Sequence, residues 1–270
     1  MKKAKTERSI LLGKPQEQPE YNKIYFDIAA DSHKGLSRPR NEDSFIYSLD
    51  CSDLCLLAAV ADGIGGNNNG DVAGNLALKM LLQQWRSFQV PRFFPQKAMT
   101  DFLKKTIMQI NRKIHEINEL YEWKSPMGTT IAAIVFLDDC IITAHAGDSR
   151  IYRLRKEQFS RLTFDHNIVN DLTRSGEPIP KYLDDSSYGR MLTQSLGPNT
   201  EVEPEITILD LTRGDRFLIC SDGLTTHVSD FEIADTLENE DSSANAVKTL
   251  LRLTLHRGAK DNVTMISVYT

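Results

Sequence analysis

The sequence is poor in cysteine, and its cysteines form no pattern that binds zinc or supports redox chemistry. Its 270 residues include four cysteines, and no two of them stand in a C-x-x-C arrangement. Cys140 and Cys220 lie inside apolar runs, where a thiol packs like a small hydrophobic side chain. Because stable disulfides belong to oxidising compartments, we expect a reduced, cytoplasmic setting.

Long hydrophobic runs and basic stripes are also missing. The longest apolar run, 54–61, is far too short for a transmembrane helix, which needs about 20 residues. The apolar patch at 10–12 is too short for the hydrophobic part of a signal peptide. The formal net charge is −5, and no basic stripe follows any expected helix. We therefore expect neither a membrane nor a nucleic-acid partner.

No linker rich in Pro, Gly or Ser divides the middle of the chain. A composition of 40% hydrophobic and 26% charged residues is that of a globular domain with a substantial core. Residues 1–22 mix charge, Gln and Pro without periodicity, so we expect a flexible N-terminal extension there. The rest, residues 23–270, is expected to form a single domain.

Hydrophobic periodicity predicts the secondary structure. Apolar residues at spacings of three and four predict helices at 71–85 and 97–120. A third helix is predicted from Ser243, as its N-cap, to Arg257, with Gly258 ending it. Strands are expected at 24–30, 44–49, 54–61, 129–137, 140–146, 151–154, 159–162, 205–209, 216–220 and 263–269.

The order of these elements predicts the architecture. Strands follow one another directly, with a hairpin signal at Asp138-Asp139, and they do not alternate with helices. This order favours an α+β fold: a four-layer α/β/β/α sandwich of two mainly antiparallel sheets flanked by helices. Residues 166–190 are the least regular stretch, and we expect a mobile flap there.

Four aspartates, each in its own turn of small residues, stand at the ends of apolar runs. Asp62, Asp148 and Asp222 follow expected buried strands, and Asp261 precedes another. A carboxylate in such a place is costly unless something pairs with it. Few cationic side chains stand in these turns, and all-oxygen ligand sets suit Mg²⁺ and Mn²⁺. The pattern therefore predicts bound divalent cations.

Seven short motifs occur in the order found in one enzyme family. They are Arg38-Pro39-Arg40-Asn41-Glu42-Asp43, Asp62-Gly63-Ile64-Gly65-Gly66, Gly128-Thr129-Thr130, Gly147-Asp148-Ser149-Arg150, Leu162-Thr163-Phe164-Asp165-His166, Ser221-Asp222-Gly223 and Asp261-Asn262-Val263-Thr264. The chain resembles the metal-dependent protein phosphatases (type 2C, PPM) over residues 24–270. The resemblance implies hydrolysis of phosphoserine and phosphothreonine in proteins, by a water that two metals activate for direct attack on phosphorus.

The resemblance also implies roles for the aspartates. Asp62 would bridge two Mn²⁺ or Mg²⁺ ions, and Gly63 would offer its backbone carbonyl to one of them. Asp222 and Asp261 would complete the ligands of the other ion. Two metals about 3.5–4 Å apart lower the pKa of a bridging water toward neutrality and offset charge on the phosphoryl oxygens.

The first motif would supply the phosphate-binding group. Arg38 stands four residues before Glu42, where the family places its phosphate-binding arginine, and a guanidinium matches two phosphoryl oxygens. Arg40, in the same loop, is the rival for this role. Glu42 and Asp43 resemble ligands that act mainly through metal-bound water.

The source of the leaving-group proton follows from a departure at Ile64. Eukaryotic members often carry His at this position, whereas bacterial members commonly have an apolar residue, so the chain resembles the bacterial type. Asp148 resembles the residue that, with Asp222, holds a third and weaker metal, whose water would then donate the proton. The alternative is that Asp148 only bonds Ser149 or Arg150 within a tight turn. His145 and His166 are expected to be structural.

Other functions remain to be weighed. A catalytically weak member of the same fold could act as a phosphoprotein-binding regulatory module, but all the metal carboxylates are present. A nucleotide-binding G-x-G-x-x-G frame fails because Asn68 stands at its last position, and no P-loop or Cys-x₅-Arg motif occurs. The resemblance implies phosphorylated proteins as partners, among them a Ser/Thr kinase and its targets, and we expect a monomer.

Overall fold

Short aliphatic runs form two antiparallel sheets in this computed structural model, which describes residues 25–49, 55–65, 69–91, 93, 95–121, 125–183 and 186–270. The first sheet has the order β1 (Asp27–His33), β11 (Val263–Tyr269), β10 (Arg216–Cys220), β7 (Arg150–Arg155) and β8 (Gln158–Arg161). The second has the order β2 (Asp43–Leu49), β3 (Leu56–Ile64), β5 (Ile131–Phe136), β6 (Cys140–Ala146) and β9 (Glu205–Asp210). The two-residue strand β4 (Gly128–Thr129) pairs with the end of β3.

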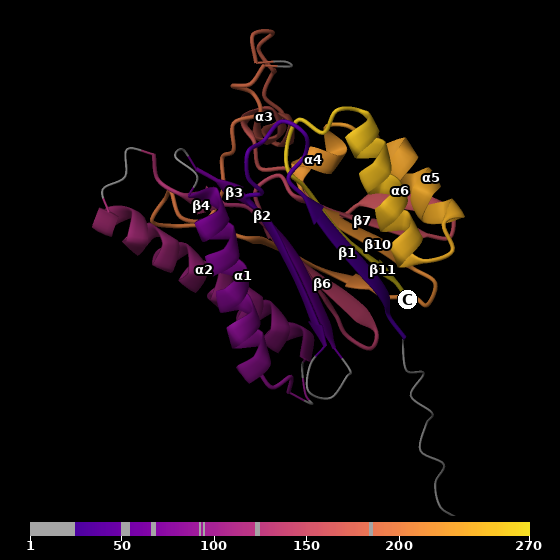
Figure 1. Cartoon of the computed structure of the whole chain (residues 1–270). Helices are drawn as coiled ribbons and strands as arrows, with labels where there is room; N and C mark the ends of the chain where they lie inside the picture. Colours follow the sequence, from indigo (N-terminus) through magenta and orange to yellow (C-terminus); the bar gives the residue numbers. More distant parts are fainter. Residues whose placement is uncertain are drawn as a thin grey trace, which may run out of the picture.

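Helices cover both outer faces of the paired sheets (Figure 1). The second sheet packs against α1 (Gly70–Ser87) and α2 (Pro95–Tyr121). The first packs against α4 (Asp222–Thr225), α5 (Asp230–Asn239) and α6 (Ser243–His256). The remaining helix of the described chain, α3 (Ile168–Ser175), lies in the segment that projects beyond the edge of the sheets in Figure 1. The predicted α+β sandwich of four layers is confirmed.

Three apolar cores fill the spaces between the layers, and β3 contributes to two of them. One set of its side chains packs beneath α1 and α2: Leu57, Ala59 and Ala61. The alternate set packs between the two sheets: Leu56, Ala58 and Val60. Because successive strand residues point to opposite faces, a strand buried on both faces is a continuous apolar run. This burial holds the polar residues at the strand's end in a fixed place.

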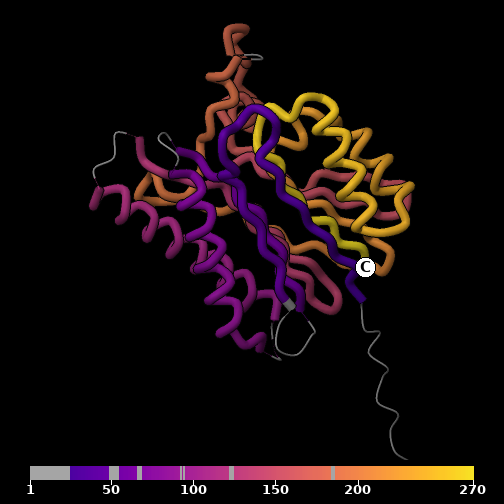
Figure 2. The backbone as a smooth tube through the Cα atoms, in the orientation of Figure 1, coloured from indigo at the N-terminus to yellow at the C-terminus, as the bar shows by residue number. Residues whose placement is uncertain are grey.

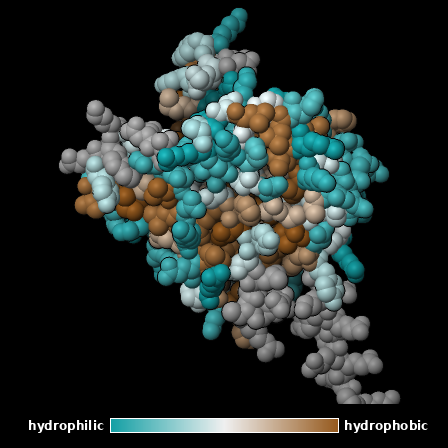
Figure 3. All heavy atoms as spheres, viewed as in Figure 1, coloured by the Kyte–Doolittle hydropathy of each residue, from teal (hydrophilic) through white to brown (hydrophobic). Residues whose placement is uncertain are grey.

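The first and last strands described lie side by side, as Figure 2 shows. β1 pairs with β11 in antiparallel register, with Asp27 opposite Tyr269. The hydropathy of the visible face is mixed, with hydrophobic residues set among hydrophilic ones (Figure 3). No helix in the described ranges is both long and apolar enough to cross a membrane.

The long predicted helices are present, whereas shorter ones were missed. The helix predicted from Ser243 is α6, but its N-cap is Ser242, whose side chain accepts a hydrogen bond from the Asn245 N–H. α5 was not predicted, although Ser229 and Glu232 form a capping box, which is a readable signal for a helix start.

The stretch 166–190 is more regular than predicted, because it contains α3. Asn167 caps the start of this helix, and Gly176 ends it with a φ of 76°. The helix has no buried residue, although Ile168, Val169 and Leu172 lie on one of its faces, and its 8 residues are a short stretch in which to read a helical period. Mobility of this segment stays a prediction. The expected extension 1–22, together with Gly66, Asn67, Asn68 and Cys51, lies outside the described residues.

Candidate active site

Five acidic side chains from strand ends and turns of both sheets meet at one edge of the sandwich. Asp62 lies near the end of β3, directly opposite Asp43 of β2 in the antiparallel register. Asp148 lies in the turn between β6 and β7, and Asp222 begins α4 directly after β10. Asp261 stands just before β11. The fold therefore brings together carboxylates that are as much as 218 positions apart in the chain.

The backbone of Asp62 is held by two threonines of the Gly-Thr-Thr motif. The Asp62 N–H donates to Thr130 Oγ1 (2.9 Å), and the Asp62 carbonyl accepts from the Thr130 N–H (2.8 Å) and from Thr129 Oγ1 (3.0 Å). The next residue has to be glycine, because a Cβ on Gly63 would lie 2.2 Å from the carbonyl oxygen of Gly70. These contacts fix the direction of the Asp62 carboxylate.

Asn262 ties the Arg38 loop to the acidic cluster. Its Oδ1 accepts from the Glu42 N–H (2.9 Å), and its Nδ2 donates to the carbonyls of Lys34 and Arg40 (2.8 Å each). Sequence reasoning gave Asn262 no role. Its place directly after Asp261, at the start of a strand, was the available signal.

Arg38 enters the cluster from this loop. Its Nη2 lies 2.7 Å from Asp261 Oδ2, and half of its side chain is exposed. The hydrogen bond to Asp261 raises the pKa of Arg38 above its usual value. The backbone carbonyl of Arg40 is anchored by Asn262, and Arg40 is not among the residues that line the pocket. The structure thus places Arg38, and not its rival, beside the carboxylates.

The turn that carries Asp148 is anchored on both sides. Ser149 Oγ bonds Thr130 Oγ1 (2.7 Å), and Arg150 forms a bidentate ion pair with Asp165, with Nη2 to Oδ2 at 2.6 Å. The two neighbours that could have bonded Asp148 within its turn therefore bond other residues. The Asp148 carboxyl itself accepts a hydrogen bond from its own backbone N–H, and both interpretations of Asp148 stay predictions.

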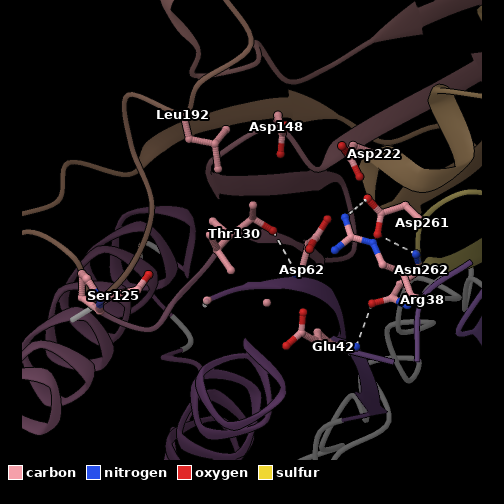
Figure 4. A pocket seen from close by; sticks show the side chains of 14 residues that line it. Arg38, Glu42, Asp62, Ser125, Thr130, Asp148, Leu192, Asp222, Asp261 and Asn262 are labelled. Carbon is pink, nitrogen blue, oxygen red and sulfur yellow. Dashed lines mark hydrogen bonds and ion pairs between the residues drawn. The ribbon is translucent and has the colours of Figure 1, made fainter. Parts of the chain in front are cut away.

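These groups surround a pocket of about 370 Å³, in which the acidic side chains point toward one another (Figure 4). Asp43 stands behind this group, with its Oδ2 accepting from Ser221 Oγ (2.7 Å). Ile64, which stands at the position of the histidine in eukaryotic family members, lines the pocket. Leu192, from the segment that follows α3 in the chain, lines it as well. The lining residues are Arg38, Glu42, Asp62, Gly63, Ile64, Gly65, Ser125, Pro126, Thr130, Asp148, Leu192, Asp222, Asp261 and Asn262.

Burial and mutual repulsion disfavour the charged forms of these carboxyls. Burial raises the pKa of Asp43 to about 7, and burial with the nearby charge of Asp222 raises the pKa of Asp148 to about 7. Burial, and then the charges of Asp43 and Asp222, hold the pKa of Asp62 well above its usual range. The pKa of Asp222 is raised by burial and then by the charge of Asp261. A bound cation would favour the charged forms of these carboxyls and offset their mutual repulsion.

Two oxygens of the cluster fit bound cations. Glu42 Oε1 and Asp43 Oδ1 are buried and have no hydrogen-bond partner within the described part of the chain. A buried carboxylate oxygen without a hydrogen-bond donor is unfavourable, so these two oxygens are suited to pair with a cation or with its bound water. The surrounding ligand atoms are all oxygen, which matches the preference of Mg²⁺ and Mn²⁺ and not that of thiolate-bound zinc. The residues present therefore fit the predicted divalent ions.

A four-layer sandwich with buried carboxylates and one arginine at its edge defines a metal-dependent phosphatase architecture, and comparison with known proteins identifies the family. The Protein phosphatase 2C family matches residues 31–265. The chain is 30% identical to protein phosphatase PhpP of Streptococcus pneumoniae, over 90% of this chain and 96% of PhpP. The chain belongs to the protein phosphatase 2C family.

Solved structures agree with this assignment. The serine/threonine phosphatase of S. agalactiae superposes with a TM-score of 0.83 and 32% identity, over 91% of this chain and all of that one. The catalytic domain of the phosphatase PstP in complex with two manganese ions superposes with a TM-score of 0.75 and 31% identity, over 91% of this chain and 99% of that one. The predicted enzyme class, a protein serine/threonine phosphatase, is confirmed, and the regulatory-module alternative is not favoured.

Proposed function

We propose that the pocket hydrolyses phosphoserine and phosphothreonine in proteins with Mn²⁺ or Mg²⁺ held by its carboxylates. The observation that carries this proposal is the convergence of acidic side chains, two of them with buried oxygens that lack donors, beside one arginine. Asp62, Asp222 and Asp261 would hold two core ions together with the Gly63 carbonyl. When bound, the ions supply an activated water for attack on phosphorus and offset the charge of the phosphoryl oxygens.

The chain's own residues orient the phosphoryl group. Arg38 offers a fork of donors at the mouth of the pocket, and its half-exposed side chain can exchange Asp261 for two phosphoryl oxygens. Glu42 and Asp43 would accept hydrogen bonds from waters around the ions. Their partnerless oxygens are the atoms free to do so.

The leaving alkoxide of serine or threonine needs a proton, and Ile64 cannot give one. Among the described residues that line the pocket there is no histidine, lysine or cysteine. We assign Asp148, with Asp222, to a third and weaker ion, which places solvent near the leaving group.

Phosphorylated proteins are the substrates, and a Ser/Thr kinase with its targets is the partner class that the family resemblance implies. A single domain over 23–270, acting as a monomer in the cytoplasm, completes the proposal. The cysteines among the described residues, Cys55, Cys140 and Cys220, are buried free thiols, which supports a reducing compartment.

The test is hydrolysis of a phosphothreonine peptide with Mn²⁺, Mg²⁺ or excess EDTA. We expect activity with either ion, none with EDTA, and its return when Mn²⁺ is restored. Asp222→Ala should lose at least ~100-fold in kcat while remaining folded, because it removes a core ligand. Asp101→Ala, at an exposed site on α2, is the matched control and should keep full activity. Undiminished turnover in EDTA would overturn the metal assignment.

A further inference from the structure

A second group of ionisable side chains lies directly behind the Asp148 turn. His145 of β6, His166 and Glu205 of β9 place ligand atoms within 4.8 Å of one another, and both histidines are buried. His145 stands opposite Glu205 in the register of β6 and β9. The two imidazole rings stack with centroids 4.7 Å apart and planes only 5° from parallel.

The bonds of this group argue against a metal site. Glu205 is already held by the Nη1 and Nη2 atoms of Arg174 from α3, at 2.6 and 3.2 Å. His145 Nε2 lies 2.8 Å from the carbonyl oxygen of Phe164, so it donates its proton there. Because nitrogen lone pairs lie in the ring planes, two parallel stacked rings cannot direct them at one ion. The group serves a different purpose.

His166 and Gly147 exchange two hydrogen bonds. The backbone N–H of Gly147 donates to the ring Nδ1 of His166 (3.1 Å), and the backbone N–H of His166 donates to the Gly147 carbonyl (3.0 Å). Nδ1 must therefore be unprotonated, which places the ring proton on Nε2, 3.6 Å from Glu205 Oε2. Burial lowers the pKa of His166, which favours this neutral form.

Gly147 needs this anchor because its backbone is unusual. Its φ is 113°, and a Cβ there would lie 2.6 Å from the Thr130 Cγ2 atom, so only glycine fits. The bonds of Ser149 and Arg150 hold the turn on the far side of Asp148. The bonds to His166 hold the near side. Of the two bonds to His166, only the one from the Gly147 N–H to Nδ1 depends on the His166 side chain.

We propose that His166 is a positioning residue that fixes the Asp148 carboxylate for the weakest metal site, through the bond from the Gly147 N–H to its Nδ1. This inference rests on the proposed role of Asp148. Arg174 of α3 holds Glu205, which faces the Nε2 side of His166 and takes no part in the bond to Gly147.

Two substitutions of His166 distinguish the roles of its two ring nitrogens. Asn places an oxygen where Nδ1 stands and can accept from the Gly147 N–H, whereas Gln reaches only the position of Nε2. We measure Mn²⁺ binding by calorimetry and by electron paramagnetic resonance on the full chain. His166→Gln should weaken the weakest site about tenfold or more, while the tighter sites change by less than about twofold. His166→Asn should stay within about threefold of wild type.

Matched controls separate this inference from the function on which it rests. Glu205→Gln keeps the Nδ1 bond and should leave the weakest site unchanged. Asp148→Ala should abolish that site. If it does not, the role of Asp148 and this inference both fail. If Asp148→Ala abolishes the site but the Asn and Gln variants weaken it equally, or neither weakens it, the inference alone fails.

A measurement on the wild-type protein covers the case in which His166→Gln does not fold. The ¹⁵N shifts of the His166 ring report which nitrogen carries the proton. Protonated Nε2 with bare Nδ1, with and without the diamagnetic ion Mg²⁺, is the expected result. The opposite tautomer would overturn the inference, because Nδ1 could not then accept from Gly147.

Discussion

Replacing the half-buried Asp62 by asparagine should stabilise the metal-free protein while abolishing its activity. Its partial burial raises the pKa of Asp62, and the charges of the neighbouring aspartates raise it further: Asp43, Asp222, Asp148 and Asp261. Without metal, these like charges repel one another. Asn keeps the size of the side chain and removes the charge, so it should relieve the repulsion.

The size of the effect depends on pH in a definite direction. A carboxyl whose folded-state pKa is raised contributes stability below its unfolded pKa, and this contribution is lost as the pH rises toward the folded pKa. Asp43 gives the scale, since its pKa rises from 3.8 to about 7. A shift of this size corresponds to ~4 kcal/mol at 1.36 kcal/mol per unit. The pKa of Asp62 is raised by burial and by the same carboxylates, so Asp62→Asn should gain stability at pH 8 and gain less at pH 5.

The assay is thermal unfolding of the metal-free protein at pH 5 and at pH 8. At pH 8 Asp62→Asn should unfold at a higher temperature than wild type, and the difference in Tm should shrink at pH 5. Saturating Mn²⁺ should reverse the order, because only wild type gains the free energy of tight binding. Asp101→Asn on the exposed face of α2 is the matched control and should change stability by less than about 0.5 kcal/mol.

One result would refute this reasoning. If metal-free Asp62→Asn unfolds at or below the temperature of wild type at pH 8, repulsion does not dominate at this site. The Asp62 carboxyl would then stabilise the metal-free fold, and the idea that the clustered carboxylates destabilise the fold until metals bind would be wrong.

Three further predictions concern single residues of the pocket. Arg38→Ala should raise KM for a phosphopeptide about tenfold or more and lower kcat, because it removes a charge-assisted contact to phosphate; a larger effect of Arg40→Ala would show that the phosphate-binding residue is misassigned. Asp148→Ala should lower kcat on a phosphoserine peptide at least about tenfold more than on p-nitrophenyl phosphate, whose leaving group hardly needs a proton; equal losses at fixed Mn²⁺ would rule out a role in protonation. Gly63→Ala should abolish activity and weaken tight Mn²⁺ binding, because its Cβ would meet the Gly70 carbonyl oxygen at 2.2 Å; normal affinity would contradict the close approach.

Much of the fold could be predicted from the sequence because its signals are local. The stripe along 97–120 predicts a helix from its own spacing, and α2 covers that range. The run ending at Asp62 predicts a strand buried on both faces, which β3 is. α3 escaped prediction because its 8 residues are too short a stretch for the helical spacing of Ile168, Val169 and Leu172 to stand out from a loop. α5 was missed despite the capping box at its start.

The acidic residues of the site could also be chosen from the sequence, since each stands in its own short motif. The order of the motifs, more than any one of them, identified the family. Their contacts could not be read in the same way. Nothing near Asn262 in the sequence indicates that it bonds the backbone of Glu42, which is 220 positions away.

The sequence by itself determined which residues are polar at strand ends and therefore which carboxylates could meet. Only the tertiary structure decided that Arg38 lies against Asp261, that Asp43 bonds Ser221, and that His166 holds the turn of Asp148. The spacing of apolar residues within a segment shows which of its faces is buried, and this can be read from the segment alone. Hydrogen bonds between segments depend on the register and stacking of two sheets, and these are set by the packing of the whole core.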